Sequence, residues 1–418
     1  MKRLLTLLSA LCCILCGRAI TDTMTGIFDD RIRTVHAVTN GNMFAPPVVM
    51  EGTGGRINFS FDHLADDRDY FRYRIVRCEA DWQPSRLAEA EYLEGFNESP
   101  IEDYEFSRAT TVPYVHYSFD FPNEHIRPTL SGNYLVQVYR EDNPDEVLWQ
   151  HRVMVSEQTA PISVSVSTVT DVDYNDGHQQ LAVTVDTERA GVDNPFNDLR
   201  VVISQNGRAD NEVALRQPMR MSGSKAVYEH QRPLVFEAGN EYRRMEVSNI
   251  NYPGMHVEDI AYSRPYYHFK LQTDQSRAGQ SYLYDQTQHG RFVVREYNSD
   301  ESDVDADYVV VHFALEYPEM PGYQIFLDGD FTSRRFDPSS IMTFNRATGL
   351  YEKAVLLKQG AYNYQYLAVP PGGKRGTTSV IEGDKYQTVN EYLVKVYTSR
   401  PTDRTDRLIG VTQITTEP

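Results

Sequence analysis

The sequence predicts an all-β protein made of several immunoglobulin-like β-sandwiches in one chain. First, apolar residues alternate with polar ones, as in Ile162-Ser163-Val164-Ser165-Val166-Ser167, and this period of two is typical of half-buried antiparallel strands. Second, Gly, Pro, Asn and Asp break such stretches into short pieces. Third, helix formers are scarce, because only residues 86–93, between Ser85 and Gly95, predict a short helix.

Predicted strands follow one another along the whole chain. Each has apolar residues at every second position and is flanked by residues that favour turns. Many short strands of this kind, without helices between them, indicate β-sandwiches. The apolar rows lie at 57–61, 71–75, 134–138, 162–166, 181–185, 199–203, 267–271, 309–315 and 362–366.

The length of 418 residues suggests two to four domains. Thr159-Ala160-Pro161 separates two predicted strands, and the acidic stretch 298–307 has little that could pack, so both are interpreted as linkers. The predicted division is a β-sandwich over 20–158, a second over 159–298 and a third over 299–418.

Residues 1–19 predict a signal peptide that is removed. Lys2 and Arg3 precede an apolar run over 4–15, which is too short to span a membrane, and Gly17 and Ala19 are the small residues expected before a cleavage site. A lipid-modified cysteine needs a small residue before it, whereas leucine precedes both Cys12 and Cys16, so we expect cleavage without lipidation. Only Cys78 then remains, which excludes an intramolecular disulfide. With no later long apolar run, we expect a soluble exported protein.

Charge and motifs argue against nucleic acids, cofactors and catalysis. The chain has 41 basic and 59 acidic residues, a net charge of −18, and phosphate binding needs a basic surface. The sequence contains neither the zinc-protease motif H-E-x-x-H, nor a Walker loop, nor G-x-G-x-x-G, nor the nucleophile elbow G-x-S-x-G. We therefore expect no catalytic residues, no metal site and no cofactor, although a triad assembled from distant residues remains open.

Two patterns leave an alternative open. The run from Asp303 to Asp307 resembles the start of a calcium loop, but its sixth and twelfth places hold Tyr308 and Ala314, so a linker is the favoured interpretation over a loose ion site. The tyrosines at 362, 364 and 366 are either one face of a strand, which we favour, or a platform that stacks on a sugar.

Five short motifs occur together in this chain. They are Cys78-Glu79-Ala80-Asp81-Trp82, Glu91-Tyr92-Leu93-Glu94-Gly95-Phe96-Asn97-Glu98, Ile101-Glu102-Asp103-Tyr104-Glu105-Phe106, Leu130-Ser131-Gly132-Asn133-Tyr134 and Asp406-Arg407-Leu408-Ile409-Gly410. Together they resemble the type IX secretion system plug protein family of Bacteroidota, and the resemblance covers nearly all of the chain after residue 19. It implies a periplasmic β-sandwich protein without catalytic residues. It also implies a partner, the outer-membrane translocon barrel, whose periplasmic opening the protein would close from the inner face of the outer membrane.

Three glycine-led motifs follow one another in the C-terminal part of the chain: Gly329-Asp330-Phe331, Gly349-Leu350-Tyr351 and Gly360-Ala361-Tyr362. Their order is similar to that in E-set modules of the glycogen-binding type, which implies an E-set-like sandwich over 299–418. The alternative function is therefore a carbohydrate-binding or glycan-processing accessory protein of the periplasm or cell surface. An exported cargo is a third interpretation, but we recognise no C-terminal sorting domain.

Four aromatic residues are the candidate partner-binding residues. Tyr92, Phe96, Tyr104 and Phe106 lie in one segment among five acidic residues. Aromatic residues are enriched at the centre of protein interfaces, and charges at the rim steer association. The alternative is that these aromatic side chains pack within their own sandwich.

Overall fold

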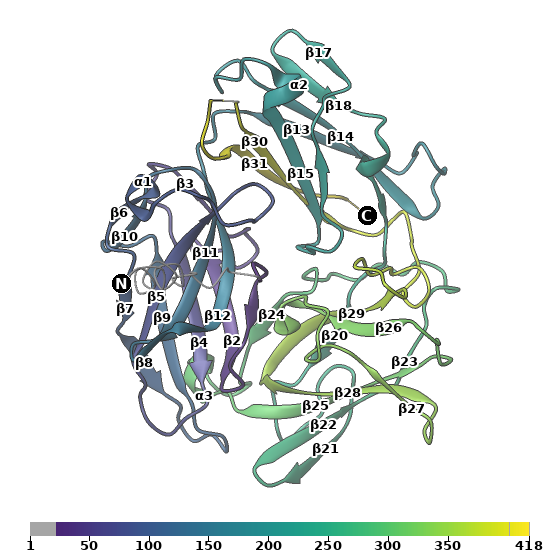
Figure 1. Cartoon of the computed structure of the whole chain (residues 1–418). Coiled ribbons are helices and arrows are strands. Elements are labelled where there is room, and N and C mark those ends of the chain that lie inside the picture. The colour runs from purple at the N-terminus through teal and green to yellow at the C-terminus, as the bar shows by residue number, and fades with distance from the viewer. Residues whose placement is uncertain (1–21, 401, 418) are drawn as a thin grey trace, which may run out of the picture.

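The computed structural model describes residues 22–400 and 402–417. The predicted signal peptide, 1–19, and its three cysteines lie outside these residues. Strands contain 47% of the residues and helices 5%, so the predicted all-β fold is confirmed. The strands form three modules, each with a buried core of its own, which lie at the left, the top and the lower right of Figure 1.

The first module, residues 22–158, is a sandwich with an aromatic core. Phe61 stacks on Tyr117 within one sheet. From the facing sheet, Trp149 packs on Phe61 and Phe71 packs on Tyr117. One sheet has the order β1-β12-β11-β5-β7, with β3 parallel to β12, and the other has the order β2-β4-β9-β8. The bounds are β1 (Gly26–Ile27), β2 (Ile32–Thr39), β3 (Val48–Met50), β4 (Ile57–His63), β5 (Phe71–Cys78), α1 (Glu89–Tyr92), β6 (Leu93–Gly95), β7 (Ser99–Ile101), β8 (Asp103–Phe106), β9 (Val115–Phe121), β10 (Ile126–Pro128), β11 (Gly132–Arg140) and β12 (Asn143–Ser156).

The second module combines residues 159–241 with the last strands of the chain. One sheet has the order β13-β14-β18-β17, with β19 beside β14, and the other has the order β16-β15-β30-β31. In Figure 1 the yellow strands β30 and β31 lie next to the teal strand β15. The bounds are β13 (Ile162–Ser167), β14 (His178–Asp186), α2 (Pro195–Asp198), β15 (Leu199–Gln205), β16 (Val213–Leu215), β17 (Arg220–Ser222), β18 (Lys225–Tyr228), the 3-10 turn η1 (Arg232–Leu234), β19 (Val235–Glu237), β30 (Glu391–Thr398) and β31 (Arg407–Thr415).

The third module, residues 242–388, is inserted between β19 and β30. One sheet has the order β20-β29-β24, with β26 beside β29, and the other has the order β21-β22-β25-β28-β27, with β23 beside β25. The bounds are β20 (Arg243–Glu246), β21 (Val257–Ser263), β22 (Tyr266–Leu271), β23 (Asp274–Gln275), β24 (Phe292–Val294), α3 (Ser302–Asp305), β25 (Tyr308–Glu316), β26 (Gln324–Asp328), the 3-10 turn η2 (Asp330–Thr332), β27 (Thr343–Asn345), β28 (Leu350–Lys358) and β29 (Gly360–Val369).

The sheets divide the chain differently from the predicted boundary between 298 and 299. β30 pairs with β15 over seven residues, from Leu199 opposite Thr398 to Gln205 opposite Tyr392. Val394 and Val396 fill the core of the second module, whereas residues on both sides of 298 share the core of the third. We therefore propose a division into 22–158, 159–241 with 389–417, and 242–388. Alternation of apolar residues shows that a strand faces a core, but not which core it faces.

The acidic stretch 298–307 fastens the third module to the first and is not a linker. The Asp307 carboxylate accepts hydrogen bonds from the backbone N–H groups of Thr111 (2.8 Å) and Val112 (3.2 Å). Asp305, at the end of α3, accepts one from Nε of Arg108 at 2.9 Å. These carboxylates thus accept from donors of the first module, and that of Asp307 is buried.

A buried ion pair lies at the same boundary between the first and third modules. Nζ of Lys358 on β28 is 2.6 Å from Oδ2 of Asp62 on β4, and both side chains are almost fully buried. Tyr308 also donates its hydroxyl proton to Asp62 at 2.6 Å. Burial alone would raise the pKa of Asp62, but Lys358 and His116 outweigh it and hold this pKa below its usual range.

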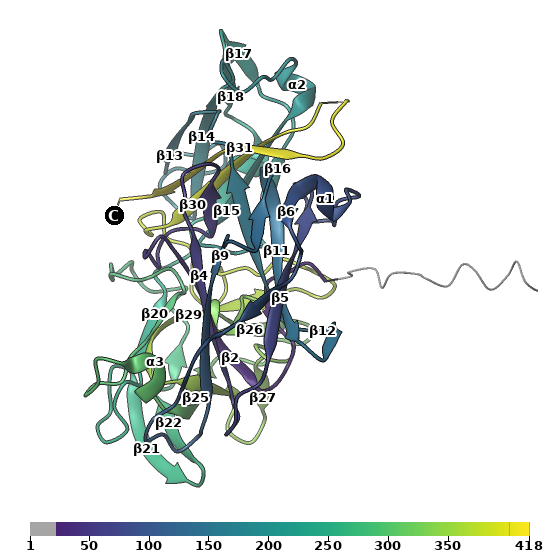
Figure 2. The same ribbon diagram turned by 90° about the vertical axis from the view of Figure 1, so that its left-hand side faces the viewer.

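The first and second modules also meet through buried polar groups. The Arg77 guanidinium donates to the carbonyl oxygens of Ser131 (2.7 Å) and Asn133 (3.1 Å) in its own module, and to that of Asp406 next to β31. Tyr397 of β30 donates to the side-chain oxygen of Asn133 at 2.7 Å. In Figure 2, which views the molecule from the side of the first module, this module extends across both of the others.

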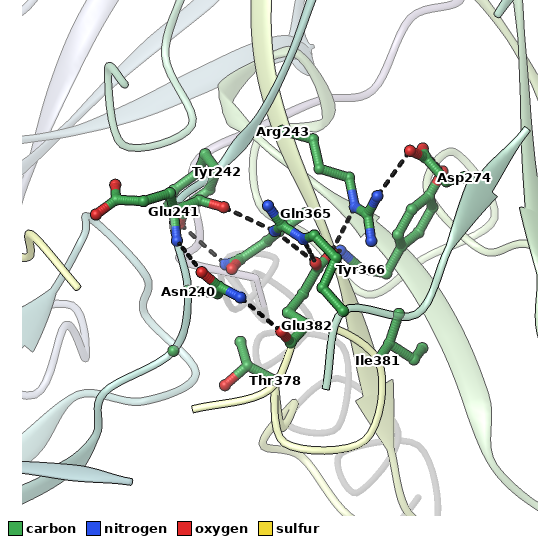
Figure 3. A network of polar contacts seen from close by, with 12 residues as sticks. Asn240, Glu241, Tyr242, Arg243, Asp274, Gln365, Tyr366, Thr378, Ile381 and Glu382 are labelled. Atoms are coloured by element: carbon green, nitrogen blue, oxygen red, sulfur yellow. Dashed lines mark hydrogen bonds and ion pairs between the residues drawn. The ribbon is translucent and has the colours of Figure 1, made fainter. Parts of the chain in front are cut away.

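The segment by which the chain enters the third module and the segment by which it leaves are joined by the network in Figure 3. Glu382 lies between Asn240, which donates to its carbonyl oxygen at 2.8 Å, and Arg243, whose Nε is 3.0 Å from Oε1 of its carboxylate. The backbone N–H of Val389 donates to Glu241 at 3.0 Å. The entering segment therefore holds the leaving segment directly, and the insertion has no free hinge at this point.

We expect the Asp62–Lys358 pair to be essential for stability. Asp62→Asn leaves a buried ammonium group without its counter-charge, so the free energy of unfolding should fall by about 3–5 kcal/mol. Asp120→Asn is the matched control, because Asp120 pairs with Arg56 at 2.8 Å at the surface and such pairs contribute about 1 kcal/mol or less. Urea unfolding of both variants measures the difference, and equal losses would contradict the role of the buried pair.

Four buried or half-buried histidines should make the protein less stable as the pH is lowered. Burial lowers the pKa of His36, on β2, from 6.5 to about 4. The unfolded chain therefore binds a proton that the folded chain does not bind until the pH approaches 4, so this contribution is complete above pH 6.5 and is lost as the pH falls. His36 alone should cost about 2 kcal/mol between pH 7 and pH 5. His63, His151 and His289, whose pKa values burial also lowers, act in the same direction.

Urea unfolding at the two pH values tests this expectation. His36→Gln should make the loss of stability between pH 7 and pH 5 smaller, whereas His125→Gln should not, because His125 is exposed. An unchanged pH dependence in His36→Gln would show that this imidazole does not titrate as described.

Candidate partner-binding surface

Phe96 is the most exposed of the four predicted partner-binding residues, with 88% of its surface accessible. It lies in the turn between β6 and β7, and both of its neighbours are fixed. Gly95 has φ +104°, and a Cβ there would lie only 2.5 Å from the carbonyl oxygen of His125. The Asn97 side chain both accepts from the N–H and donates to the carbonyl of Ile75, each at 2.8 Å. The phenyl ring of Phe96 is therefore exposed to solvent on a turn whose backbone is fixed on both sides.

Tyr104 and Phe106 lie on β8, an edge strand of the first module that pairs with β9 on one side. Their rings meet edge to face with centroids 5.8 Å apart, and they remain 37% and 48% exposed. The Arg68 guanidinium lies 4.3 Å from the centroid of Tyr104 and 4.7 Å from that of Tyr70. Arg68 and Tyr70 were not predicted from the sequence, because no spacing pattern connects them to β8.

The elements that carry or flank these residues run along one side of the molecule. β6, β7 and β8 follow the left edge of Figure 1, on the side of the first module turned away from the other two. Five carboxylates of the same segment are exposed, so the surface combines aromatic rings with negative charge. They are Glu94, Glu98, Glu102, Asp103 and Glu105.

Tyr92 does not belong to this surface. It ends α1, and the pairing of the adjacent β6 with β10 turns its ring into the core of the first module, where its centroid is 6.0 Å from that of Tyr134. Burial raises the pKa of Tyr92 to about 12. For this residue the alternative interpretation, packing within its own sandwich, is the one that the structure supports.

The tyrosine row of β29 is not a sugar-binding platform. Tyr362, Tyr364 and Tyr366 are buried, and the last two donate their hydroxyl protons to Asp274 at 2.8 Å each. Phe331, from the Gly329-Asp330-Phe331 motif, stacks against Phe313 inside the same module. The residues that suggested carbohydrate binding therefore form a core.

The remaining features add no chemistry to this surface. Cys78 is buried, and burial raises the pKa of its thiol to about 12, which leaves it a poor nucleophile at neutral pH. Among the described residues, no helix has the length and apolar character that a bilayer crossing requires.

Comparison with known proteins places the chain in a family. Residues 32–157, which are nearly the whole first module, match the family described as type 9 secretion system plug protein, first domain. The crystal structure of a hypothetical protein from Parabacteroides merdae is 40% identical, with a TM-score of 0.93, and the match covers 94% of this chain and 100% of that chain.

Other matches add nothing to this assignment. A DNA-bound alkylpurine DNA glycosylase AlkC from Pseudomonas fluorescens matches 30% of each chain at 12% identity, with a TM-score of 0.18. No curated protein matches the chain. On the match of its first module and its motifs, the chain belongs to the type 9 secretion system plug protein family, and its role is associated with that secretion system.

Proposed function

We propose that this protein is the non-enzymatic plug that closes the periplasmic opening of the outer-membrane translocon barrel of the type 9 secretion system. The observation that carries the proposal is the match of residues 32–157 to the first domain of a plug protein. We further propose that the chain is exported by its N-terminal segment and acts in the periplasm, at the inner face of the outer membrane.

A plug acts by its volume, so it needs a body that keeps its shape. Three sets of buried contacts support such a body here. Asp62 and Lys358 join the first and third modules, Arg77 joins the first to the second, and Glu382 joins the second to the third. Separating any two modules would leave these charged or polar groups without their partners. The energetic cost of that loss opposes bending between modules.

The strength of the closure can be estimated from occupancy. To keep about 99 of 100 channels closed, the concentration of free protein must be about 100 times its Kd for the barrel. This corresponds to about 2.7 kcal/mol beyond half occupancy. An aromatic hot spot contributes about 2 kcal/mol or more to an interface. The loss of one such anchor would therefore open a measurable fraction of the channels.

We propose the surface of Phe96, Tyr104 and Phe106 as the contact with the barrel. The double variant Phe96→Ala, Tyr104→Ala should fold, because both side chains are accessible in the described structure. It should bind the barrel about 30-fold more weakly, which would reduce occupancy from about 99% to about three quarters. Binding to the purified barrel and channel conductance measure the two effects.

Tyr252→Ala is the matched control, because Tyr252 is 72% exposed on the third module. It should bind like the unchanged protein. If the double variant unfolds, or folds and binds at full strength, these aromatic residues are not the contact. The plug proposal itself would survive that result, because another face could bind the barrel.

Deletion of the protein tests the plug proposal directly. Translocon channels without engaged cargo should become permeable to large solutes, and re-expression of the chain should close them. A tagged chain should also capture the barrel from detergent-solubilised outer membrane. Channels that remain closed after a clean deletion would overturn the proposal.

A further inference from the structure

A cavity of about 280 Å³ lies where the three modules meet. Trp82 and Arg152 line it from the first module, Lys395 from the second, and Phe292 and Arg334 from the third. Small-molecule sites occur preferentially at domain interfaces, and their volumes begin near 300 Å³. The cavity therefore has the place and the size of a site for a small ligand.

The cavity wall contains one cation without a partner. Among the described residues, the Arg152 guanidinium forms no ion pair, and its one hydrogen bond runs from Nε to the carbonyl oxygen of Thr23 at 2.7 Å. Its guanidinium lies 4.4 Å from the centroid of Trp82, a cation–π contact. Burial lowers the pKa of Arg152, and the charges of Glu212 and Asp22, neither of which forms an ion pair with it, do not offset this effect. The other basic residues of the wall are paired, as Arg208–Asp210, Arg291–Glu391, Arg334–Asp330 and Lys395–Glu212.

The wall also contains an unpaired imidazole and an apolar region. Nε2 of His36 is buried without a hydrogen-bond partner among the described residues, and the ring packs on Phe292 with centroids 4.2 Å apart. Buried polar atoms are normally paired, so this atom indicates a missing group. Met24, Met43 and Met154 line the same cavity.

We propose that this cavity binds a small monocarboxylate with a short apolar tail, its carboxylate on Arg152 and its tail against the three methionines. A guanidinium group presents two parallel N–H donors that match the two oxygens of a carboxylate. A monoanion balances the single unpaired cation, whereas a dianion such as phosphate would meet the nearby carboxylates of Glu212 and Glu391. Because all three modules line the site, the ligand contacts each of them. This inference does not depend on the plug proposal.

Two sources carry this chemistry, a short fatty acid and the C-terminal residue of a peptide. Hexanoate and N-acetyl-leucine are the respective probes, and hexylamine and hexanol are the controls without a carboxylate. The full chain is labelled at the methionine methyl groups and titrated by NMR. Either acid should shift the signals of Met24, Met43 and Met154 saturably, while those of Met219 and Met255, which are exposed, should not move. The acid that binds more tightly identifies the source.

Arg152→Gln should weaken binding of the preferred acid at least about tenfold, because a charge-assisted pair is lost. Arg56→Gln, at an exposed arginine of the first module, should leave it unchanged. If Arg152→Gln does not fold, the proposal is judged on the titration of the unchanged chain with the two acids and the two controls. The proposal is overturned if neither acid saturates the three signals at millimolar concentration, if hexylamine or hexanol shifts them equally, or if a folded Arg152→Gln binds as before.

Discussion

The pairing of β30 with β15 forces the chain to return to the second module after the whole third module has been made. The second core can close only when residues separated by almost two hundred positions meet, so the third module must hold its two ends together. Glu382 and Glu241 do this by accepting hydrogen bonds from Asn240 and Val389 across the two crossings. The positions of the third module, the junction cavity and the interface with the first module all follow from this insertion.

Buried polar groups determine how the modules sit against one another. A buried ion pair such as Asp62–Lys358 gains little over an apolar contact of the same shape, but it strongly disfavours any arrangement in which one partner is buried alone. Apolar surfaces can slide, whereas these pairs allow one register between modules. The same logic explains why the unpaired Arg152 stands out, since it lies at a junction where every other cation of the cavity wall has a carboxylate.

Several buried tyrosines have a shared structural use. Tyr308, Tyr364 and Tyr397 place their rings in apolar cores and their hydroxyl groups on polar partners at or near the module boundaries. Phenylalanine could fill the same volume but would leave Asp62, Asp274 and Asn133 with fewer donors. The candidate site differs, because Phe96 and Phe106 are exposed and have no polar group to satisfy, which is why their exposure indicates a partner more clearly than an exposed tyrosine would.

The sequence by itself determined the fold class and the family, because a period of two is a local property of each strand and the family motifs are short runs of residues. It also predicted, as a candidate contact, the segment that carries Phe96, Tyr104 and Phe106. Only the tertiary structure decided that β30 and β31 belong to the second module, that the acidic stretch 298–307 holds the first module, that Tyr92 is buried, and that Arg152 and His36 face one cavity. The physical reason is that alternation reports whether a residue faces a core, while the choice of core, the partner of each charge and the depth of each ring depend on contacts between residues far apart in the chain.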